Sequence, residues 1–555
     1  MAAETVGGET PTLFLRNATG LVRGWSVRDS MIYAVLATNF VTLAIYEFAF
    51  AAPAFPKGQL ITSVIISGVW VSFLVIAYAG LVVTIPRAGG DYVWQTRILG
   101  SGLGFVMAAT GWWFILWLWA PIYGNILAVQ FFEPLWATLK FTWPGSGATS
   151  GAAWFGTHNG VFTVSLITIV LAGVLVSVGM AGYAKIQRWC IYGGLVGFGV
   201  IVVLLLVNSH ATFVSSFNLE THKLFGLNNA YGATQAAAAK IGYHAPSLGF
   251  GPLGPTFLLV PVMMFFILWP NWGATLYGEI RGANDFKRVF SGMFGGLWIT
   301  VALTVAFLLL IDKTIGWSFY QNSNQLNYQV FVLTPHVSTV LPIWPYPVLF
   351  AAWLVHNTVF QVALILVMSL WFFGWVGTLF LSSTRVIFAA AFDRVLPDRA
   401  AEVSEKRKVP FYSLILMLLP AVGLSAVYAY NSTFVTYTYD ATLVIAITFL
   451  FSSIAVVLLP FIKKDLWRAS PASKIRIFGV QIVPVAGWIT IGLLGFDLYE
   501  WFTNALYGVG LAYHDSLYFM GALYVLAIIL YVGARLVRKR QGIDLGLINK
   551  EIPVE

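Results

Sequence analysis

One stretch of the chain places a helix breaker between aromatic and polar side chains in the middle of an apolar run, Trp269-Pro270-Asn271-Trp272-Gly273. Proline removes a backbone hydrogen bond and clashes with the preceding turn, and glycine three residues later adds conformational freedom. In an apolar segment the freed N–H and C=O groups persist only where they line a cavity or bind a ligand. The stretch therefore predicts a binding site at a helix break, with a plain proline kink as the alternative.

A second apolar stretch carries polar groups at its middle, in Ala37-Thr38-Asn39-Phe40 followed by Thr42. An asparagine that faced lipid would be costly, so Asn39 should face protein or a cavity. Packing by a buried asparagine is the alternative to a binding role. The pair of interrupted stretches is a stronger indication of a site than either one alone.

Other site chemistries find no support in the sequence. The single cysteine, Cys190, excludes an internal disulfide and a cysteine metal cluster, and the seven histidines show no metal-ligand spacing. The chain has no glycine-rich phosphate loop followed by Lys-Ser or Lys-Thr. We therefore expect no metal, no cofactor, no ATP-driven step and no enzyme activity.

The elements that hold the two stretches follow from composition. Of the 555 residues, 59% are hydrophobic and 10% are charged, against about 25% charged in an ordinary soluble domain. This excludes a soluble enzyme, a nucleic-acid-binding protein and a disordered scaffold. The apolar runs are continuous over about 20 residues, which is typical of membrane helices rather than barrel strands.

The apolar runs predict an all-α polytopic membrane protein of about twelve transmembrane helices. A short helix near 346–356, crowded by prolines, is expected to lie at the outer surface. The expected spans are 28–52, 59–85, 102–133, 159–181, 186–208, 255–280, 289–312, 358–392, 411–430, 436–462, 481–502 and 516–537.

Basic residues predict the orientation. With the N-terminus inside, the outer segments hold only Lys57, Lys140, Lys223, Lys240 and Lys313, and all other Lys and Arg residues fall on the cytoplasmic side. This favours a multi-pass plasma-membrane protein with both termini cytoplasmic. The N-terminal region lacks an apolar segment before the first span, so no cleavable signal peptide is expected.

Two further features concern the outer side and the repeat. Residues 314–346 contain no Asp, Glu, Lys or Arg, which predicts a polar-aromatic cap over the outer mouth or, alternatively, a face adapted to acid. The interrupted spans are the first and the sixth. A repeat of five helices inverts the second half, so the two breaks should face each other at the midplane.

The expected organisation is a 5+5 inverted repeat with broken helices 1 and 6, followed by two extra C-terminal helices. Its parts are an N-terminal tail 1–27, a first repeat 28–208, an outer loop 209–254, a second repeat 255–462, helices 11 and 12 in 463–537, and a C-terminal tail 538–555.

Three stretches resemble the amino acid–polyamine–organocation (APC) permease superfamily with its LeuT-type fold. The first is Pro86-Arg-Ala-Gly-Gly-Asp-Tyr-Val-Trp94, and the second runs from the break through Gly278-Glu279 to Arg281-Gly-Ala-Asn284. The third is Ala389-Ala-Ala-Phe-Asp393-Arg-Val-Leu-Pro397 followed by Lys408-Val-Pro410. The chain departs from the family where Ala37-Thr38-Asn39 replaces a glycine-rich break, and where Glu279 stands without a second acid.

The resemblance implies secondary active transport by alternating access, with an amino acid bound at the two breaks. Backbone N–H groups near Asn39 would bind its carboxylate, and carbonyl groups near Leu268 to Asn271 its ammonium group. The expected substrate-binding residues are Ala37, Thr38, Asn39, Phe40, Thr42, Trp112, Leu268, Trp269, Pro270, Asn271, Trp272, Gly273 and Thr275.

Charged and hydroxyl side chains in the spans suggest gates and ion coupling. Glu279 is expected to pair with an inner-loop arginine as a cytoplasmic gate, with a solvated helix end as the alternative. Glu47 is either a proton site or a buried hydrogen-bonded acid. Ser382 and Ser383 are candidate Na⁺ ligands, unless they bond to their own helix. The coupling ion is thus H⁺ or Na⁺, or exchange is uncoupled.

Other functions compete with amino acid transport. A polyamine, a nucleobase or another small organic cation could be the substrate, and a non-transporting membrane sensor could use the same fold. A sensor would typically carry an appended signalling domain, and the short tails do not favour one. Charged residues near the midplane are sparse, which does not favour a channel. The expected partners are a small-molecule amino acid and the lipid bilayer, without nucleic acid, and the oligomeric state stays open.

Overall fold

The computed structural model describes residues 21, 24–55, 57–140, 151–245, 248–249, 252–331, 339–431, 434 and 436–550. Most of the expected N-terminal tail and the end of the C-terminal tail lie outside these residues. Within them the chain is almost entirely helical. The sheet in this part of the chain is a hairpin of two short strands, β1 (Arg476–Ile477) and β2 (Val480–Gln481).

Twelve helical segments in the described part of the chain are long and apolar enough to cross a membrane, which confirms the predicted number and order of spans. Their ends lie within a few residues of the predicted ones in most cases. They are Val27–Ala49, Leu60–Thr84, Ser101–Leu139, His158–Ser177, Gly179–Val207, Leu253–Glu279, Phe286–Ile315, Thr358–Phe392, Phe411–Tyr430, Tyr437–Ile462, Ile482–Thr503 and His514–Arg540.

The first span changes conformation at Asn39. Helix α1 (Val27–Thr38) ends there with φ 19° and ψ 87°, and a π-helical turn, η1 (Phe40–Ala44), leads into α2 (Ile45–Ala54). The side-chain oxygen of Asn39 accepts the Thr42 N–H at 3.0 Å, and its amide donates to the Trp371 carbonyl at 2.9 Å. Asn39 is therefore the residue that fixes the interruption.

The sixth span is interrupted at the predicted stretch. Helix α12 (Leu253–Phe257) and α13 (Val260–Ile267) precede it, and a 3₁₀ segment, η5 (Trp272–Glu279), follows it. Residues 268–271 between them are not helical. The chain thus changes helix type on both sides of Pro270, as a proline without an N–H requires.

The other spans are built from the following elements. They are α3 (Leu60–Thr84), α5 (Ser101–Ala109), η2 (Thr110–Phe114), α6 (Leu116–Leu127), η3 (Ala128–Phe132), α7 (Glu133–Leu139), α8 (His158–Ser177), α9 (Gly179–Val207), α14 (Phe286–Leu310), η6 (Ile311–Ile315), α17 (Thr358–Met368), α18 (Leu370–Phe392), α19 (Phe411–Tyr430), η8 (Thr436–Tyr439), α21 (Asp440–Ile462), α23 (Ile482–Thr503) and α24 (His514–Arg540).

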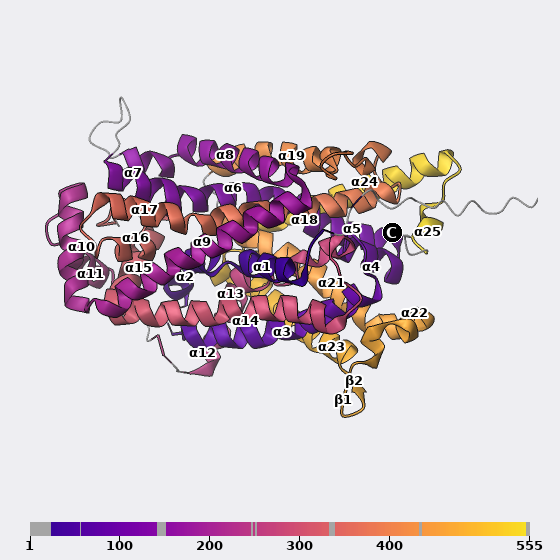
Figure 1. Ribbon diagram of the computed structural model, residues 1–555, viewed down its shortest axis with the longest axis horizontal. Helices are drawn as coiled ribbons and strands as arrows, with labels where there is room; N and C mark the ends of the chain where they lie inside the picture. The colour runs from indigo at the N-terminus through magenta and orange to yellow at the C-terminus, as the bar shows by residue number, and fades with distance from the viewer. Residues whose placement is uncertain are drawn as a thin grey trace, which may run out of the picture.

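The spans run roughly parallel to the long axis of the molecule, and the connecting elements gather at its two ends (Figure 1). The left end carries α10 (His210–Phe225), α11 (Ala230–Lys240), α15 (Trp317–Phe331) and α16 (Pro347–Ala352). The right end carries α4 (Asp91–Ile98), α22 (Lys464–Ala469), the hairpin and α25 (Leu545–Ile548). The short 3₁₀ segments are η4 (Gly151–Gly156), η7 (Asp398–Ala401), η9 (Pro471–Lys474), η10 (Ala505–Tyr507) and η11 (Gly510–Ala512).

Two of the expected loops contain helices. Residues 209–254 hold α10 and α11, and the amide-rich segment after α14 forms α15, which packs against α2 and α11. Local signals explain the first pair. Ser209 caps α10, Gly226 ends it with φ 70°, and Asn229 caps α11.

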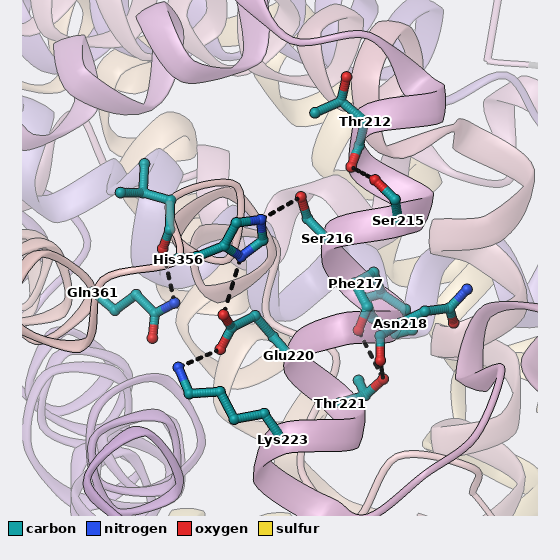
Figure 2. Close-up of polar contacts among 11 residues, drawn as sticks. Thr212, Ser215, Ser216, Phe217, Asn218, Glu220, Thr221, Lys223, His356 and Gln361 are labelled. Atoms are coloured by element: carbon teal, nitrogen blue, oxygen red, sulfur yellow. Dashed lines mark hydrogen bonds and ion pairs between the residues drawn. The ribbon is translucent and has the colours of Figure 1, made fainter.

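A charged cluster holds α10 against the connection between α16 and α17 (Figure 2). The buried Glu220 carboxylate lies 3.1 Å from Nδ1 of His356 and 3.3 Å from the Lys223 ammonium group. Nε2 of His356 lies 3.4 Å from the Ser216 hydroxyl. These contacts join two segments that are 140 residues apart.

Close helix packing positions the first break. A Cβ atom at Gly296 of α14 would lie 2.5 Å from Cβ of Ala34, so only glycine allows α14 to approach α1 this closely. Next to this contact, the Thr38 hydroxyl lies 2.8 Å from the Thr300 hydroxyl of α14. The position of α1 beside the break is therefore set by α14.

Candidate functional site

A small cavity lies where the two interrupted spans meet α6 and α18. The first span contributes Ala37 and Leu43, and the sixth span contributes Trp269 and Trp272. Helix α6 contributes Trp119 and Tyr123, and α18 contributes Trp375, Thr378 and Leu379. No carboxylate or basic side chain is among these nine lining residues, so the cavity is suited to an uncharged, apolar group.

The aromatic rings around the cavity pack against each other and fix its shape. The Trp269 ring stands nearly perpendicular to Trp272 and to Trp119, with centroid distances of 5.0 and 5.7 Å. The Tyr123 and Trp375 ring centroids, also in the lining, lie 3.6 Å apart. Such mutual packing restricts the rotamers of the lining residues.

Two indole N–H groups of the cavity lining have no hydrogen-bond partner. They belong to Trp119 and Trp272, whereas Trp269 donates to the Phe265 carbonyl at 2.7 Å and Thr378 donates to the Trp375 carbonyl at 2.7 Å. An unpaired buried donor costs about 1–3 kcal/mol. A bound group with acceptor atoms would satisfy these donors.

Of the predicted substrate-binding residues, Ala37, Trp269 and Trp272 line this cavity. Thr38 and Asn39 hydrogen-bond to neighbouring helices instead. The Phe40 ring packs on Phe198 and Trp371, each with a centroid distance of 4.8 Å. Thr42 lines a separate small cavity and accepts a hydrogen bond from Gln130 at its carbonyl.

The other predicted residues of the sixth span are buried and are not among the residues that line the cavity. Leu268 and Pro270 are buried in the break. Both polar atoms of the Asn271 amide and the Thr275 hydroxyl lack a hydrogen-bond partner, and all three atoms are buried. Gly273 lies beside Tyr33, whose nearest ring atom would be 3.4 Å from an added Cβ.

Trp112 on η2 reaches the site indirectly. Its ring centroid lies 4.6 Å from that of Trp272, so it supports a lining residue from behind. The adjacent Trp113 points to α19, where its indole N–H donates to the Leu416 carbonyl at 3.1 Å.

Glu279 makes a bidentate ion pair that sequence analysis did not name. Its two carboxylate oxygens accept from Nε and Nη2 of Arg385 at 2.7 and 3.1 Å. Arg385 lies in α18, inside a span rather than in a loop. Both side chains are at most 1% exposed, so Glu279 is not a solvated helix end.

A second buried pair lies at the same end of the molecule. Arg97 of α4 donates to both carboxylate oxygens of Asp393, at 2.5 and 2.8 Å. Each of these side chains is 2% exposed. Together the two pairs tie η5 and α4 to α18 and the residue that follows it.

The remaining predicted residues are not among those that line the cavity. Glu47 on α2 is buried and accepts a hydrogen bond from the Tyr439 hydroxyl. The Ser382 hydroxyl lies 2.6 Å from the Tyr33 hydroxyl and donates to the Trp272 carbonyl at 3.1 Å. Ser383 contacts the Met417 sulfur at 3.1 Å, so it points toward α19.

The sequence of the chain matches a known protein family. The family model described as "Amino acid permease" matches residues 31–530. The chain belongs to the amino acid permease family. A curated relative, the branched-chain amino acid permease BcaP of Lactococcus lactis subsp. cremoris (strain MG1363), is 24% identical over 296 residues. The match covers 52% of this chain and 54% of the relative, so it spans about half the length of each.

Sequence analysis missed several residues of this permease's site. Trp119, Tyr123, Trp375, Thr378 and Leu379 line the cavity, but the sequence contains 22 Trp and 43 Phe residues, so no single aromatic residue stands out. Arg385 could have been identified, because a charged residue inside an apolar span requires a buried partner.

Proposed function

We propose that this permease is a secondary active transporter of neutral, apolar amino acids. The observation that carries the proposal is the cavity at the two helix breaks, whose lining is aromatic and aliphatic and includes no charged side chain. Family membership supports transport of amino acids, and the relative's name supports a branched-chain side chain.

The polar ends of the substrate bind where the helix breaks expose backbone groups. The unpaired indole N–H groups of Trp119 and Trp272 supply donors for the substrate carboxylate. Carbonyl groups in residues 268–271, where the chain is not helical, supply acceptors for the ammonium group. Tight packing of the apolar side chain in the cavity provides selectivity.

The two buried ion pairs close the cytoplasmic side in alternating access. Glu279–Arg385 and Arg97–Asp393 hold η5 and α4 against the α18 region, and both pairs must separate for that side to open. In this assignment the protein lies in the plasma membrane with both termini in the cytoplasm. The basic α22 and C-terminal end of α24 then face the cytoplasm, in keeping with the positive-inside rule.

The alternative substrates and the sensor function are less well supported. A polyamine or other organic cation requires acidic side chains at its site, but Glu279 is paired with Arg385 and Glu47 is bound to Tyr439. A Na⁺ ion at Ser382 would have to replace that hydroxyl's contacts with Tyr33 and Trp272. A sensor without turnover would bind the same amino acids without transporting them.

Ligand-induced stabilisation of the purified protein tests substrate class. A ligand at about 100 times its Kd stabilises the folded state by about 2.7 kcal/mol. We expect leucine, isoleucine and valine to raise the unfolding temperature, and lysine and putrescine to leave it unchanged. Trp113→Leu, outside the cavity, should retain the response, and Trp272→Ala should lose it. Stabilisation by putrescine alone would contradict the proposal.

A further inference from the structure

The Asp91 carboxyl group lies fully buried among neutral hydrogen-bond donors. Asp91 is the first residue of α4 and is 0% exposed. Its Oδ1 atom accepts from the Tyr78 hydroxyl of α3 and, at 2.5 Å, from the Ser452 hydroxyl of α21. Its Oδ2 atom has no hydrogen-bond partner. Gln95, one turn later, donates to Ser452 at 2.8 Å and extends this polar group.

Asp91 takes part in none of the ion pairs found in the described part of the chain. The charged residues on the elements around it are Arg97 on α4, which pairs with Asp393, and Glu279 on η5, which pairs with Arg385 on α18. Helices α3 and α5 and segment η2 carry no charged residue. The acidic residue of α21, Asp440, is its first residue, about 18 Å from Ser452 at 1.5 Å per residue.

The tyrosine hydroxyl that contacts Asp91 is that of Tyr78, whereas Tyr92 lies beside the Arg97–Asp393 pair and the Tyr277 hydroxyl contacts the Ser30 hydroxyl. A buried carboxylate without a cation is costly, so its neutral form is favoured. Burial raises the pKa of Asp91 to about 6, and the Ser452 and Tyr78 hydrogen bonds limit the rise.

Asp91 is connected to the cavity through two side chains. The Trp112 indole lies beside its carboxyl group, and the Trp112 ring packs on the cavity residue Trp272 with a centroid distance of 4.6 Å. The Tyr78 hydroxyl lies beside the amide of Asn271 in the break. Neither the Trp112 N–H nor the Asn271 amide makes a hydrogen bond of standard geometry.

The backbone before Asp91 is attached to the broken span itself. The Gly89 N–H donates to the Thr275 carbonyl of η5 at 2.8 Å. At Gly90, where φ is 43°, an added Cβ would lie 3.0 Å from the Ala274 carbonyl group. A displacement of η5 must therefore change the surroundings of Asp91.

We propose that Asp91 is the proton-binding group that couples amino acid transport to the proton gradient, an inference that rests on the proposed function. In the closed arrangement the carboxyl group is protonated once the site has equilibrated with a medium below about pH 6. When η5 moves and the cytoplasmic side opens, water reaches Asp91 and its O–H bond breaks, which leaves the carboxylate and delivers one proton to the cytoplasm with the substrate. The carboxylate regains a proton in the conformation open to the outside.

The test separates exchange from accumulation in proteoliposomes that contain the full-length protein. Radiolabelled leucine is followed in counterflow without a pH gradient and in uptake driven by an inward proton gradient. We expect Asp91→Asn to retain counterflow and to lose both gradient-driven accumulation and leucine-induced proton entry. Asp91→Glu should restore gradient-driven accumulation. The matched control Asp440→Asn removes a buried carboxylate that bonds to Ser516 and should retain all three signals.

The pH dependence of uptake distinguishes a proton-binding role of Asp91 from a purely structural one, because only a proton-binding role lets a change near Asp91 shift the midpoint. Ser452 stabilises the ionised form of Asp91, so Ser452→Ala should shift the midpoint of gradient-driven uptake upward by about one pH unit. Wild-type accumulation and proton entry in Asp91→Asn would overturn the proposal, as would wild-type leucine counterflow without any proton movement. Absence of counterflow for every neutral amino acid would instead refute the proposed function.

Discussion

Glu279 of η5 and Arg385 of α18 form two charge-assisted hydrogen bonds, of 2.7 and 3.1 Å, in a place where neither side chain is more than 1% exposed. The pair joins the broken sixth span to the eighth span, below a cavity that both spans line. Opening of the cytoplasmic side in the proposed transport cycle requires these residues to separate.

Glu279→Gln should destabilise the closed arrangement, because it leaves the Arg385 guanidinium buried without a counter-charge. Loss of one partner of a buried ion pair costs about 3–5 kcal/mol. Backbone hydrogen exchange in η5 should therefore become faster by about two to four orders of magnitude. Asp398→Asn, which breaks the more exposed pair with Arg538, is the control and should leave η5 exchange unchanged. Unaltered exchange and transport in Glu279→Gln would show that the pair is not a gate.

Trp375→Leu should change substrate preference, because it removes ring area from the cavity lining. Loss of such apolar contact costs about 1–3 kcal/mol, or about 10–200-fold in kcat/KM for leucine. Phenylalanine should lose less, since the enlarged cavity accommodates a bigger side chain. Kinetics of competing uptake measure the ratio, and Trp113→Leu is the matched control. An equal loss for both substrates would argue against a role of Trp375 in selectivity.

Gly90→Ala should lower stability. Gly90 has φ 43° and ψ −112°, and an added Cβ would lie 3.0 Å from backbone atoms of Ala274 and Thr275. Backbone strain of this kind costs about 1–3 kcal/mol. Gly199→Ala, a helical position with no atom within 4 Å of the added Cβ, should be neutral or slightly stabilising. Thermal unfolding in detergent compares the two, and an equal effect would show that the loop tolerates a side chain.

The distribution of basic residues makes a topology prediction. Tags inserted at 228–232, at the start of α11, should react with impermeant reagents from outside intact cells. Tags at 402–406, after η7, should react only once the cells are permeabilised. A tag at 146–150, also expected outside, falls beyond the described residues. The reverse labelling pattern would invert the assigned orientation.

The sequence was sufficient to predict the spans and the breaks, because both depend on local chemistry. Twenty-residue apolar runs specify membrane helices, and Pro270 cannot donate the hydrogen bond that a continuous helix needs. At Asn39 the side chain replaces backbone hydrogen bonds and caps the following turn. These effects act within a few residues, so they can be recognised without knowledge of the tertiary structure.

The cavity lining and the buried ion pairs depend on contacts between distant segments. Trp119 and Trp375 meet in the cavity although 256 positions separate them, and nothing in either local sequence distinguishes them from other aromatic residues. Asn271 is not among the residues that line the cavity, and its amide lies near the Tyr78 hydroxyl. The direction in which a side chain leaves a broken helix depends on the backbone angles at the break, and the sequence pattern does not specify these.

The most direct test of the proposed function is uptake by proteoliposomes that contain only this protein. Radiolabelled leucine should enter in a saturable manner, and isoleucine and valine should compete while lysine and putrescine do not. Trp272→Ala should abolish uptake, and Trp113→Leu should retain it. Saturable uptake of putrescine or lysine in preference to leucine, or the absence of uptake of any amino acid by the folded protein, would contradict the assignment of the cavity as a site for neutral amino acids.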